Sequence, residues 1–171
     1  RRRIIKLAVE LLRREGNLDV TDLVAGGETA GIPYAAWIAE ATNKPMLYVR
    51  KKPKGFGRNA QIEGALREGQ RVILIEDLAT DGGSKINFVR ALRDAGAEIS
   101  DIFVVFFYGV FPNALNAIEE IGVNLHYLCS WQDVLKVAEE DQYFSKNSIK
   151  EVREFLMDPT GWSKARGGRG S

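Results

Sequence analysis

The chain has 171 residues, of which 45% are hydrophobic and 27% charged, and its formal net charge is +1. This composition predicts a single globular domain over residues 1–171 that builds its core without disulfides, because Cys129 is the only cysteine. The balanced charge argues against nucleic-acid binding, and no apolar run approaches the ~20 residues of a membrane span.

Apolar periodicity predicts alternating helices and strands along the chain. The first part reads as helix 3–15, strand 22–25, helix 32–42, strand 46–51 and an irregular stretch that runs to about residue 69. The second part reads as strand 71–78, helix 84–95, strand 102–108, helix 113–121, strand 125–129, helices near 132–140 and 148–156, and a flexible glycine-rich tail at 163–171. This alternation predicts an α/β fold with a mostly parallel twisted sheet flanked by helices.

A glycine-rich turn follows the first predicted strand. Residues 25–33 read Ala-Gly-Gly-Glu-Thr-Ala-Gly-Ile-Pro, with Pro33 near the first turn of the next helix. In a parallel sheet this turn lies at the carboxyl ends of the strands, where ligands bind. The pattern alone is equally compatible with an ordinary strand-to-helix connection.

The stretch from residue 52 to 69 has no clear periodicity and is basic at its start. Five cations fall within the nine residues 50–58 with no acid among them, and Gly55 and Gly57 add conformational freedom. Such a run is often a solvated surface segment. Beside a phosphate site, a mobile cationic loop would stabilise a departing anion and exclude water.

The most informative segment is residues 75–84, Ile-Glu-Asp-Leu-Ala-Thr-Asp-Gly-Gly-Ser. A buried strand ends in two carboxylates, and a hydroxyl- and glycine-rich turn then leads into a helix, whose start can hold a phosphate. Two carboxylates before a phosphate cradle suit a sugar phosphate, with a hydrated Mg²⁺ nearby. The alternative is an acidic strand end followed by an ordinary turn.

Residues 72–84 resemble the phosphoribosyl-pyrophosphate (PRPP) signature of the type I phosphoribosyltransferases. Residues 48–58 and 62–64 resemble the catalytic lid of orotate phosphoribosyltransferases, and the resemblance runs from about residue 3 to residue 162. It implies a sheet domain with a small hood and a mobile lid loop. Members of that family have an N-terminal hood segment before the first helix, which we expect this chain to lack.

The resemblance also implies an activity. Orotate and PRPP would give orotidine 5′-monophosphate and pyrophosphate in pyrimidine (UMP) biosynthesis, in a cytoplasmic homodimer whose lids reach into the neighbouring subunit's site. Mg²⁺ would be held mainly by PRPP and water, without a direct protein ligand; His126 and Cys129 alone cannot form a metal cluster. We expect no nucleic-acid partner and no membrane contact.

The residues that the resemblance assigns to the site fall into three groups. Lys54, Asp77 and Glu76 would be catalytic, with the two acids on the ribose hydroxyls. Thr80 and Tyr108 would contact the base. The residues expected to bind PRPP are Thr29, Ala30, Gly31, Arg50, Lys51, Lys54, Phe56, Glu76, Asp77, Leu78, Ala79, Thr80, Asp81, Gly82, Gly83 and Ser84.

The chain departs from the usual orotate pattern at three places. Ala30 stands where many members have a lysine, Phe56 stands where the lid usually has a histidine, and residues 106–111 lack the arginine that meets the carboxylate of orotate. A bacterial subgroup is similar throughout, which keeps orotate as the leading substrate. A phosphoribosyltransferase for another nucleobase, and a non-catalytic regulator that senses PRPP with the same fold, are the alternatives.

Overall fold

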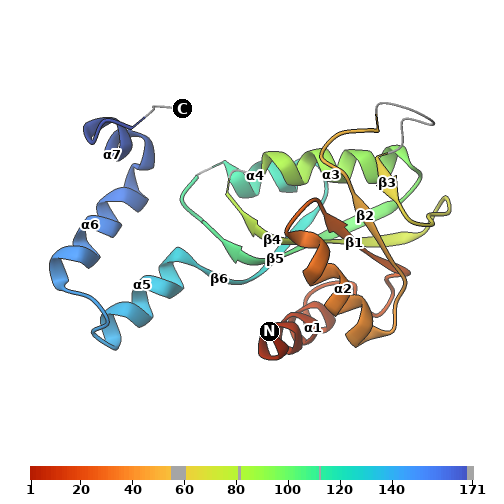
Figure 1. Ribbon diagram of the computed structural model, residues 1–171, viewed down its shortest axis with the longest axis horizontal. Coiled ribbons are helices and arrows are strands. Elements are labelled where there is room, and N and C mark those ends of the chain that lie inside the picture. The colour runs from red at the N-terminus through yellow and green to blue at the C-terminus, as the bar shows by residue number, and fades with distance from the viewer. Residues whose placement is uncertain (55–60, 81, 112, 169–171) are drawn as a thin grey trace.

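The computed structural model describes residues 1–54, 61–80, 82–111 and 113–168. Within them lies a six-stranded sheet of order β3-β2-β1-β4-β5-β6 (Figure 1). Its strands are β1 Leu23–Gly27, β2 Met46–Val49, β3 Ile62–Glu63, β4 Arg71–Ala79, β5 Glu98–Phe107 and β6 Asn124–Ser130. All neighbouring strands are parallel except β2 and β3, which confirms the predicted mostly parallel sheet.

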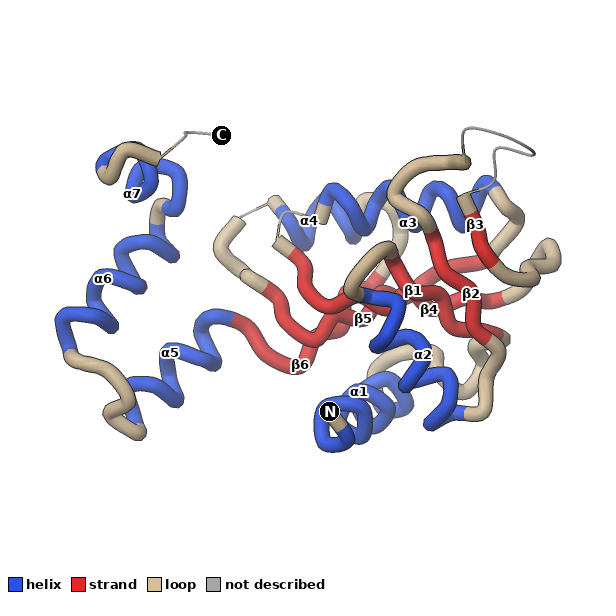
Figure 2. The backbone as a smooth tube through the Cα atoms, in the orientation of Figure 1, coloured by secondary structure: helices blue, strands red, loops and turns tan. Residues whose placement is uncertain are grey.

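Helices cover both faces of this sheet. They are α1 Arg2–Arg14, α2 Gly31–Thr42, α3 Gly83–Asp94, α4 Ala114–Glu119, α5 Trp131–Glu140, α6 Lys146–Met157 and α7 Pro159–Ala165. Figure 2 shows α1 and α2 on one face and α3 and α4 on the other. β4 supplies both cores, because Ile73 and Ile75 pack on the α1–α2 side while Val72 and Leu74 pack on the α3–α4 side. Its continuously apolar sequence therefore predicted its burial correctly.

Three elements differ from the prediction. β5 begins at Glu98 instead of residue 102, because its polar first residues pair with the starts of β4 and β6. β3 is only two residues long, too short to show a periodicity. α7 occupies residues 159–165 and so includes the start of the predicted tail; Pro159 begins it, and the Asp158 side chain accepts a 2.9 Å hydrogen bond from the N–H of Gly161.

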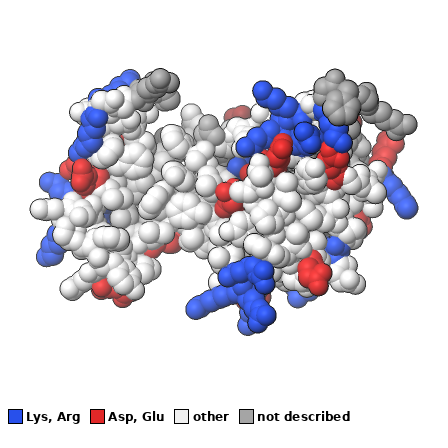
Figure 3. Space-filling view, viewed as in Figure 1, with Lys and Arg blue, Asp and Glu red and all other residues white. Residues whose placement is uncertain are grey.

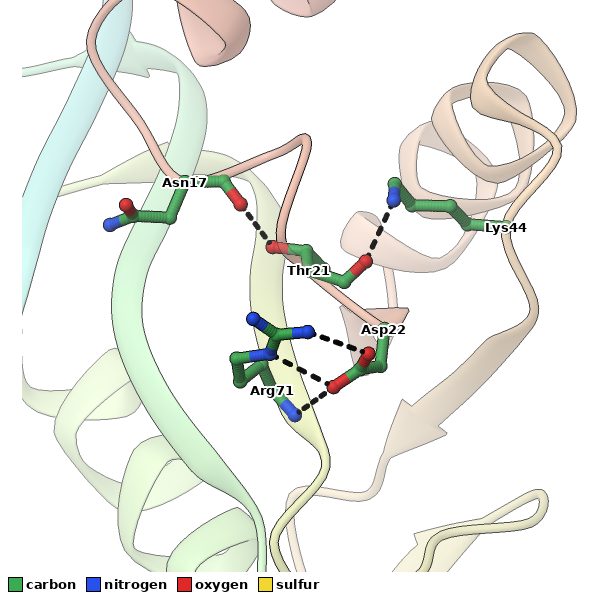
Figure 4. A network of polar contacts seen from close by, with 5 residues as sticks. All are labelled: Asn17, Thr21, Asp22, Lys44 and Arg71. Carbon is green, nitrogen blue, oxygen red and sulfur yellow. Dashed lines mark hydrogen bonds and ion pairs between the residues drawn. The ribbon is translucent and has the colours of Figure 1, made fainter.

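Polar contacts fasten the amino-terminal ends of the strands (Figure 4). The Arg71 guanidinium donates to both oxygens of Asp22, with Nη2 3.1 Å from Oδ1 and Nε 3.2 Å from Oδ2. These bonds lower the pKa of the Asp22 carboxyl. Lys44 Nζ donates to the backbone oxygen of Thr21 at 2.7 Å. The start of β1 is thereby tied to β4 and to the end of α2, at the edge opposite the glycine turns.

A second network at the same edge surrounds the buried carboxylate of Asp101 on β5. His126 Nε2 lies 2.7 Å from Oδ1, while Asn17 Nδ2 and Ser100 Oγ donate to Oδ2 at 2.7 and 2.6 Å. Burial alone would raise the pKa of Asp101, but these hydrogen bonds outweigh it and hold the pKa well below its usual range. The network joins the α1–β1 loop to β5 and β6.

The last three helices form an arm that leaves the sheet after β6 (Figure 1). α5 and α6 share a small apolar cluster of Leu135, Ala138 and Ile149. The arm extends on the side toward which the arrowheads of β4 and β5 point, where a hood was expected. No helix in the described part of the chain is both long and apolar enough to cross a membrane.

Candidate functional site

Two helices begin at the carboxyl edge of the sheet, directly after the adjacent strands β1 and β4. β1 ends at Gly27, residues 28–30 form a turn whose Glu28–Thr29 peptide is cis, and α2 starts at Gly31. Ala30 is the N-cap of α2 and gives it no side-chain hydrogen bond. Backbone donors and the positive end of the helix dipole therefore face this edge, which suits an anion.

The turn after β4 has the same character. Glu76 and Asp77 lie within the last residues of the strand, Thr80 follows it, and Gly82 is the N-cap of α3, again without a side-chain cap. Gly82 has φ +84°, and a Cβ there would lie 3.3 Å from the backbone oxygen of Ala114. The turn therefore requires glycine at this position. Asp81 lies outside the described residues.

The two acids of the pair have different surroundings. Glu76 is 5% exposed, and Lys85 Nζ on α3 lies 2.9 Å from its Oε2, with both side chains buried. Its Oε1 is buried and has no hydrogen-bond partner among the described residues. Burial raises the pKa of Glu76, and the ammonium of Lys85 opposes that shift. Asp77 is only partly buried, so it is the more accessible carboxylate at this edge.

The glycines of the β1–α2 turn make room for Glu76. A Cβ added at Gly27 or at Gly31 would collide with Glu76 Oε1. Even an alanine at either position would therefore displace the carboxylate. These glycines have a packing reason that is independent of any ligand, which the sequence could not reveal because Glu76 lies 45 residues beyond Gly31.

The basic segment after β2 is held by contacts with β3 and with the β1–α2 turn. Lys54 Nζ lies 2.6 Å from Glu63 Oε1 on β3, and Arg50 Nη1 lies 3.5 Å from the same oxygen. The hydrogen bond from Lys54 lowers the pKa of Glu63. The backbone N–H of Lys51 donates to Glu28 Oε2 at 2.7 Å, which ties this segment to the β1–α2 turn.

Basic side chains gather beside this segment in the space-filling view (Figure 3). Phe56 and the rest of residues 55–60 lie outside the described residues, so the predicted lid loop stays a prediction.

Tyr108 follows β5 at the same edge. Its N–H donates to the backbone oxygen of Ala79 at 2.9 Å, which places it beside the β4–α3 turn. Its ring meets Phe106 and Trp131 edge to face, with centroids 5.7 and 5.9 Å apart. Trp131 begins α5, and its Nε1 is buried with no hydrogen-bond partner in the part of the chain that the structure describes. An aromatic cluster therefore stands where an arginine was expected in orotate enzymes.

The structure brings most of the predicted site together. The turn residues 29–31, the described residues of 76–84 and Tyr108 share one edge, whereas Arg50 and Lys54 pair with β3 beside it. Sequence reasoning missed Lys85, Glu63 and Trp131. Lys85 had a signal, because it stands three, four and seven residues before apolar positions of α3 and thus on the buried face of that helix.

The fold and the carboxyl edge define a type I phosphoribosyltransferase. An adenine phosphoribosyltransferase from Thermoanaerobacter pseudethanolicus shares the fold with a TM-score of 0.60, at 22% identity over 75% of this chain and 79% of its own. An orotate phosphoribosyltransferase from Aeropyrum pernix superposes with a TM-score of 0.66, at 30% identity over 82% of this chain and 77% of its own.

The chain belongs to the orotate phosphoribosyltransferase family. It is 52% identical to the Cereibacter sphaeroides enzyme over 94% of this chain and 68% of that protein. The Ruegeria sp. enzyme is also 52% identical, over 93% and 70%. No family model matches the chain. It is accordingly a pentosyltransferase, which transfers the phosphoribosyl group of PRPP to orotate and yields orotidine 5′-monophosphate for pyrimidine synthesis.

Proposed function

We propose that PRPP, as its Mg²⁺ complex, binds across the two glycine turns and that orotate enters beside Tyr108. The observation that carries this placement is the pair of adjacent helix starts, α2 and α3, which lack side-chain caps and flank the acidic pair. PRPP carries a phosphate at one end and a diphosphate at the other, so one helix start serves each anion. A Mycobacterium tuberculosis orotate phosphoribosyltransferase, 29% identical over 76% of this chain and 72% of its own with a TM-score of 0.61, has been solved with PRPP.

The proposed roles follow the order of the turns. Residues 80–84 hold the 5′-phosphate, Asp77 binds the ribose with Glu76 buried behind it, and residues 27–31 hold the diphosphate. The partly exposed carboxylate of Asp77 is best placed to accept hydrogen bonds from ribose hydroxyls. Ala30 offers only its backbone, so the diphosphate relies on backbone donors and on cations from elsewhere.

Those cations come from the basic segment. As the bond between the anomeric carbon and the diphosphate oxygen breaks, its electron pair leaves with the diphosphate, and the sugar becomes oxocarbenium-like. A ring nitrogen of orotate then donates the electron pair of the new glycosidic bond and gives up its proton to the departing diphosphate or to water, so no protein nucleophile is needed. Lys54, assisted by Arg50 and Lys51, would neutralise the charge that develops on the leaving group.

Mg²⁺ enters as part of the substrate. The donor set fits an ion that brings its own oxygens, because Asp77 is partly exposed at the edge whereas Glu76 is engaged with Lys85. Mg²⁺ keeps several waters and prefers phosphate oxygens. When bound, the ion offsets the charge of the diphosphate and helps it to depart.

The aromatic cluster of Phe106, Tyr108 and Trp131 provides an apolar wall for a planar base. We also propose a homodimer in which the lid of one subunit reaches the site of the other, as the family resemblance implies. The enzyme would work in the cytoplasm, where the free thiol of Cys129 stays reduced.

The test is an assay of pyrophosphate release by the pure protein with Mg²⁺, PRPP and, in separate reactions, orotate, uracil, hypoxanthine or adenine. We expect pyrophosphate release with orotate but not with the other three bases. Excess chelator should stop this reaction. Preference for another base would reassign the aromatic wall. PRPP binding without turnover on any base would favour the non-catalytic regulator, and full activity in excess chelator would remove Mg²⁺ from the proposal.

A further inference from the structure

Glu76 is the point at which the three parts of the proposed PRPP site meet. Its Oε2 is paired with Lys85 Nζ at 2.9 Å, and Lys85 Nζ also donates to Ser84 Oγ at 3.1 Å. Its Oε1 lies against Gly27 and Gly31. One buried carboxylate thus contacts the turn assigned to the diphosphate and, through one ammonium, the turn assigned to the 5′-phosphate.

This arrangement is costly for a purely structural feature. Lys85 stands in the first turn of α3, where the helix dipole disfavours a cation, and its side chain is only 7% exposed. A buried ion pair seldom stabilises a fold more than apolar residues of the same size would. The geometry fits a role in ligand binding, because the ammonium of Lys85 keeps the Glu76 carboxylate charged and fixes its orientation at the carboxyl edge of the sheet.

We propose that Lys85 is a positioning residue that, through Glu76, sets the two phosphate-binding turns against each other for PRPP. The inference rests on the placement of PRPP proposed above. Lys85 does not touch the reacting atoms. It holds Glu76 turned into the space left by Gly27 and Gly31, and it links that carboxylate to Ser84, so Asp77 is left as the carboxylate that meets the ribose.

The central variant is Lys85→Met, which keeps the length and apolar stem of the side chain but removes its charge. The value of kcat/KM for PRPP should fall roughly 10- to 100-fold, because a small displacement of binding groups costs about that much. The KM for orotate should change less than about twofold, because the base binds beside Tyr108. Lys85→Arg should recover part of the loss, and Arg90→Met, at an exposed position of the same helix, should behave as wild type.

A pH profile separates positioning from stability. The charged groups that act on Glu76 are Lys85 on α3, Asp77 beside it on β4 and Lys51 after β2. Without Lys85 the buried Glu76 keeps its proton to higher pH, so the acid limb of kcat/KM for PRPP should move upward in Lys85→Met. The double variant Glu76→Gln/Lys85→Met has no carboxylate at position 76, so its acid limb should not show this upward shift.

The double variant also protects the test against a misfolded single variant, because it leaves no unpaired buried charge. If Glu76 and Lys85 act as one unit, the fold-loss in kcat/KM of the double variant should be smaller than the product of the fold-losses of Glu76→Gln and Lys85→Met. Wild-type kinetics for PRPP in folded Lys85→Met, or in the double variant, would overturn the positioning role, as would losses that simply multiply. A wild-type protein without transferase activity would instead contradict the proposed function itself.

Discussion

At the scale of single residues, the two neighbouring acids of β4 illustrate what a sequence can and cannot specify. The pair predicted a ribose-binding edge, yet it could not reveal that Glu76 is buried against Lys85 while Asp77 is partly exposed. That difference depends on α3 packing over the sheet. Gly82, by contrast, was predictable, because a turn between a strand and a helix commonly needs the positive φ that the structure has there.

Asp77→Asn tests the ribose contact. A ribose hydroxyl donates more strongly to a carboxylate than to an amide, and a charge-assisted hydrogen bond of that kind corresponds to roughly 10- to 100-fold in KM for PRPP. Steady-state kinetics with varied PRPP measure the effect, and thermal unfolding should be nearly unchanged because Asp77 is not deeply buried. If kcat and KM for PRPP both match wild type, the acid is only a strand end.

At the scale of elements, the short strand β3 has a role that the sequence did not suggest. It returns the basic segment to the sheet, and Glu63 on it holds Lys54 and Arg50 beside β2. Two residues are too few for a periodic signal, so β3 could not be predicted. β5 was predicted too short for a related reason, because Asp101 reads as a loop residue until its buried partners are known.

Lys54→Ala should lower kcat far more than it raises KM for PRPP, because in the proposed mechanism the charge of Lys54 acts as the diphosphate departs. Loss of one preorganised charge costs about 10²- to 10³-fold in rate. The melting temperature should hardly move, since ion pairs at the surface add little stability. Lys52→Ala, at an exposed position of the same segment, is the matched control; equal kcat values for the two variants would argue against the role of Lys54.

Glu63→Gln asks whether β3 restrains Lys54 before catalysis. If Lys54 acts on the leaving group as proposed, it must first break its ion pair with Glu63. That pair is partly exposed, so its loss should raise kcat by about two- to fivefold. Single-turnover rates at saturating PRPP provide the measurement. A fall in rate would mean that Glu63 aligns Lys54 instead of restraining it.

The Asp101 network should make stability depend on pH. Because the folded-state pKa of Asp101 is depressed, its contribution is present above the unfolded pKa of about 4 and is lost as the pH falls toward the folded value. Asp101→Asn should therefore reduce unfolding free energy by about 1–3 kcal/mol at pH 7. In urea titrations the gap to wild type should narrow progressively below about pH 5. A gap that stays constant down to pH 2.5 would contradict this assignment.

At the scale of the whole molecule, the polar networks that stabilise the fold and the turns proposed to bind PRPP lie at opposite edges of one sheet. The hydrogen-bond networks around Asp22 and Asp101 join the amino-terminal ends of the strands, whereas the two helix starts without a side-chain cap lie at the carboxyl ends. The order of elements and the parallel sheet followed from the sequence, because they rest on periodicity and on glycine turns. The course of the arm α5–α7 did not, since it depends on the angles at which consecutive helices of the arm pack on one another.

The proposed exchange of lids between subunits can be tested by mixing two impaired variants, assayed at a PRPP concentration below the wild-type KM, where both are nearly inactive. Lys54→Ala supplies an intact acidic pair, and Asp77→Asn supplies an intact lid, so each heterodimer should contain one complete site. Co-refolded mixtures should recover up to about a quarter of wild-type activity, because half of the random pairs are heterodimers with one working site of two. Absence of recovery, with exchange verified by mass spectrometry, would mean that each lid serves its own chain.

The space shared by Gly27, Gly31 and Glu76 also constrains how this sequence can drift. Two glycines of one turn and a glutamate 45 residues beyond Gly31 compete for one volume, so a side chain added at either glycine displaces the carboxylate. Shortening the acid at 76 removes only one obstacle to an alanine. At position 27 the Cβ would still lie 2.8 Å from the ring of Phe88, and at position 31 it would lie 2.5 Å from the backbone oxygen of Ile75, so further changes would have to accompany it. Substitutions here should thus be strongly epistatic, with the accessible mutational paths fixed by which of the three changes first.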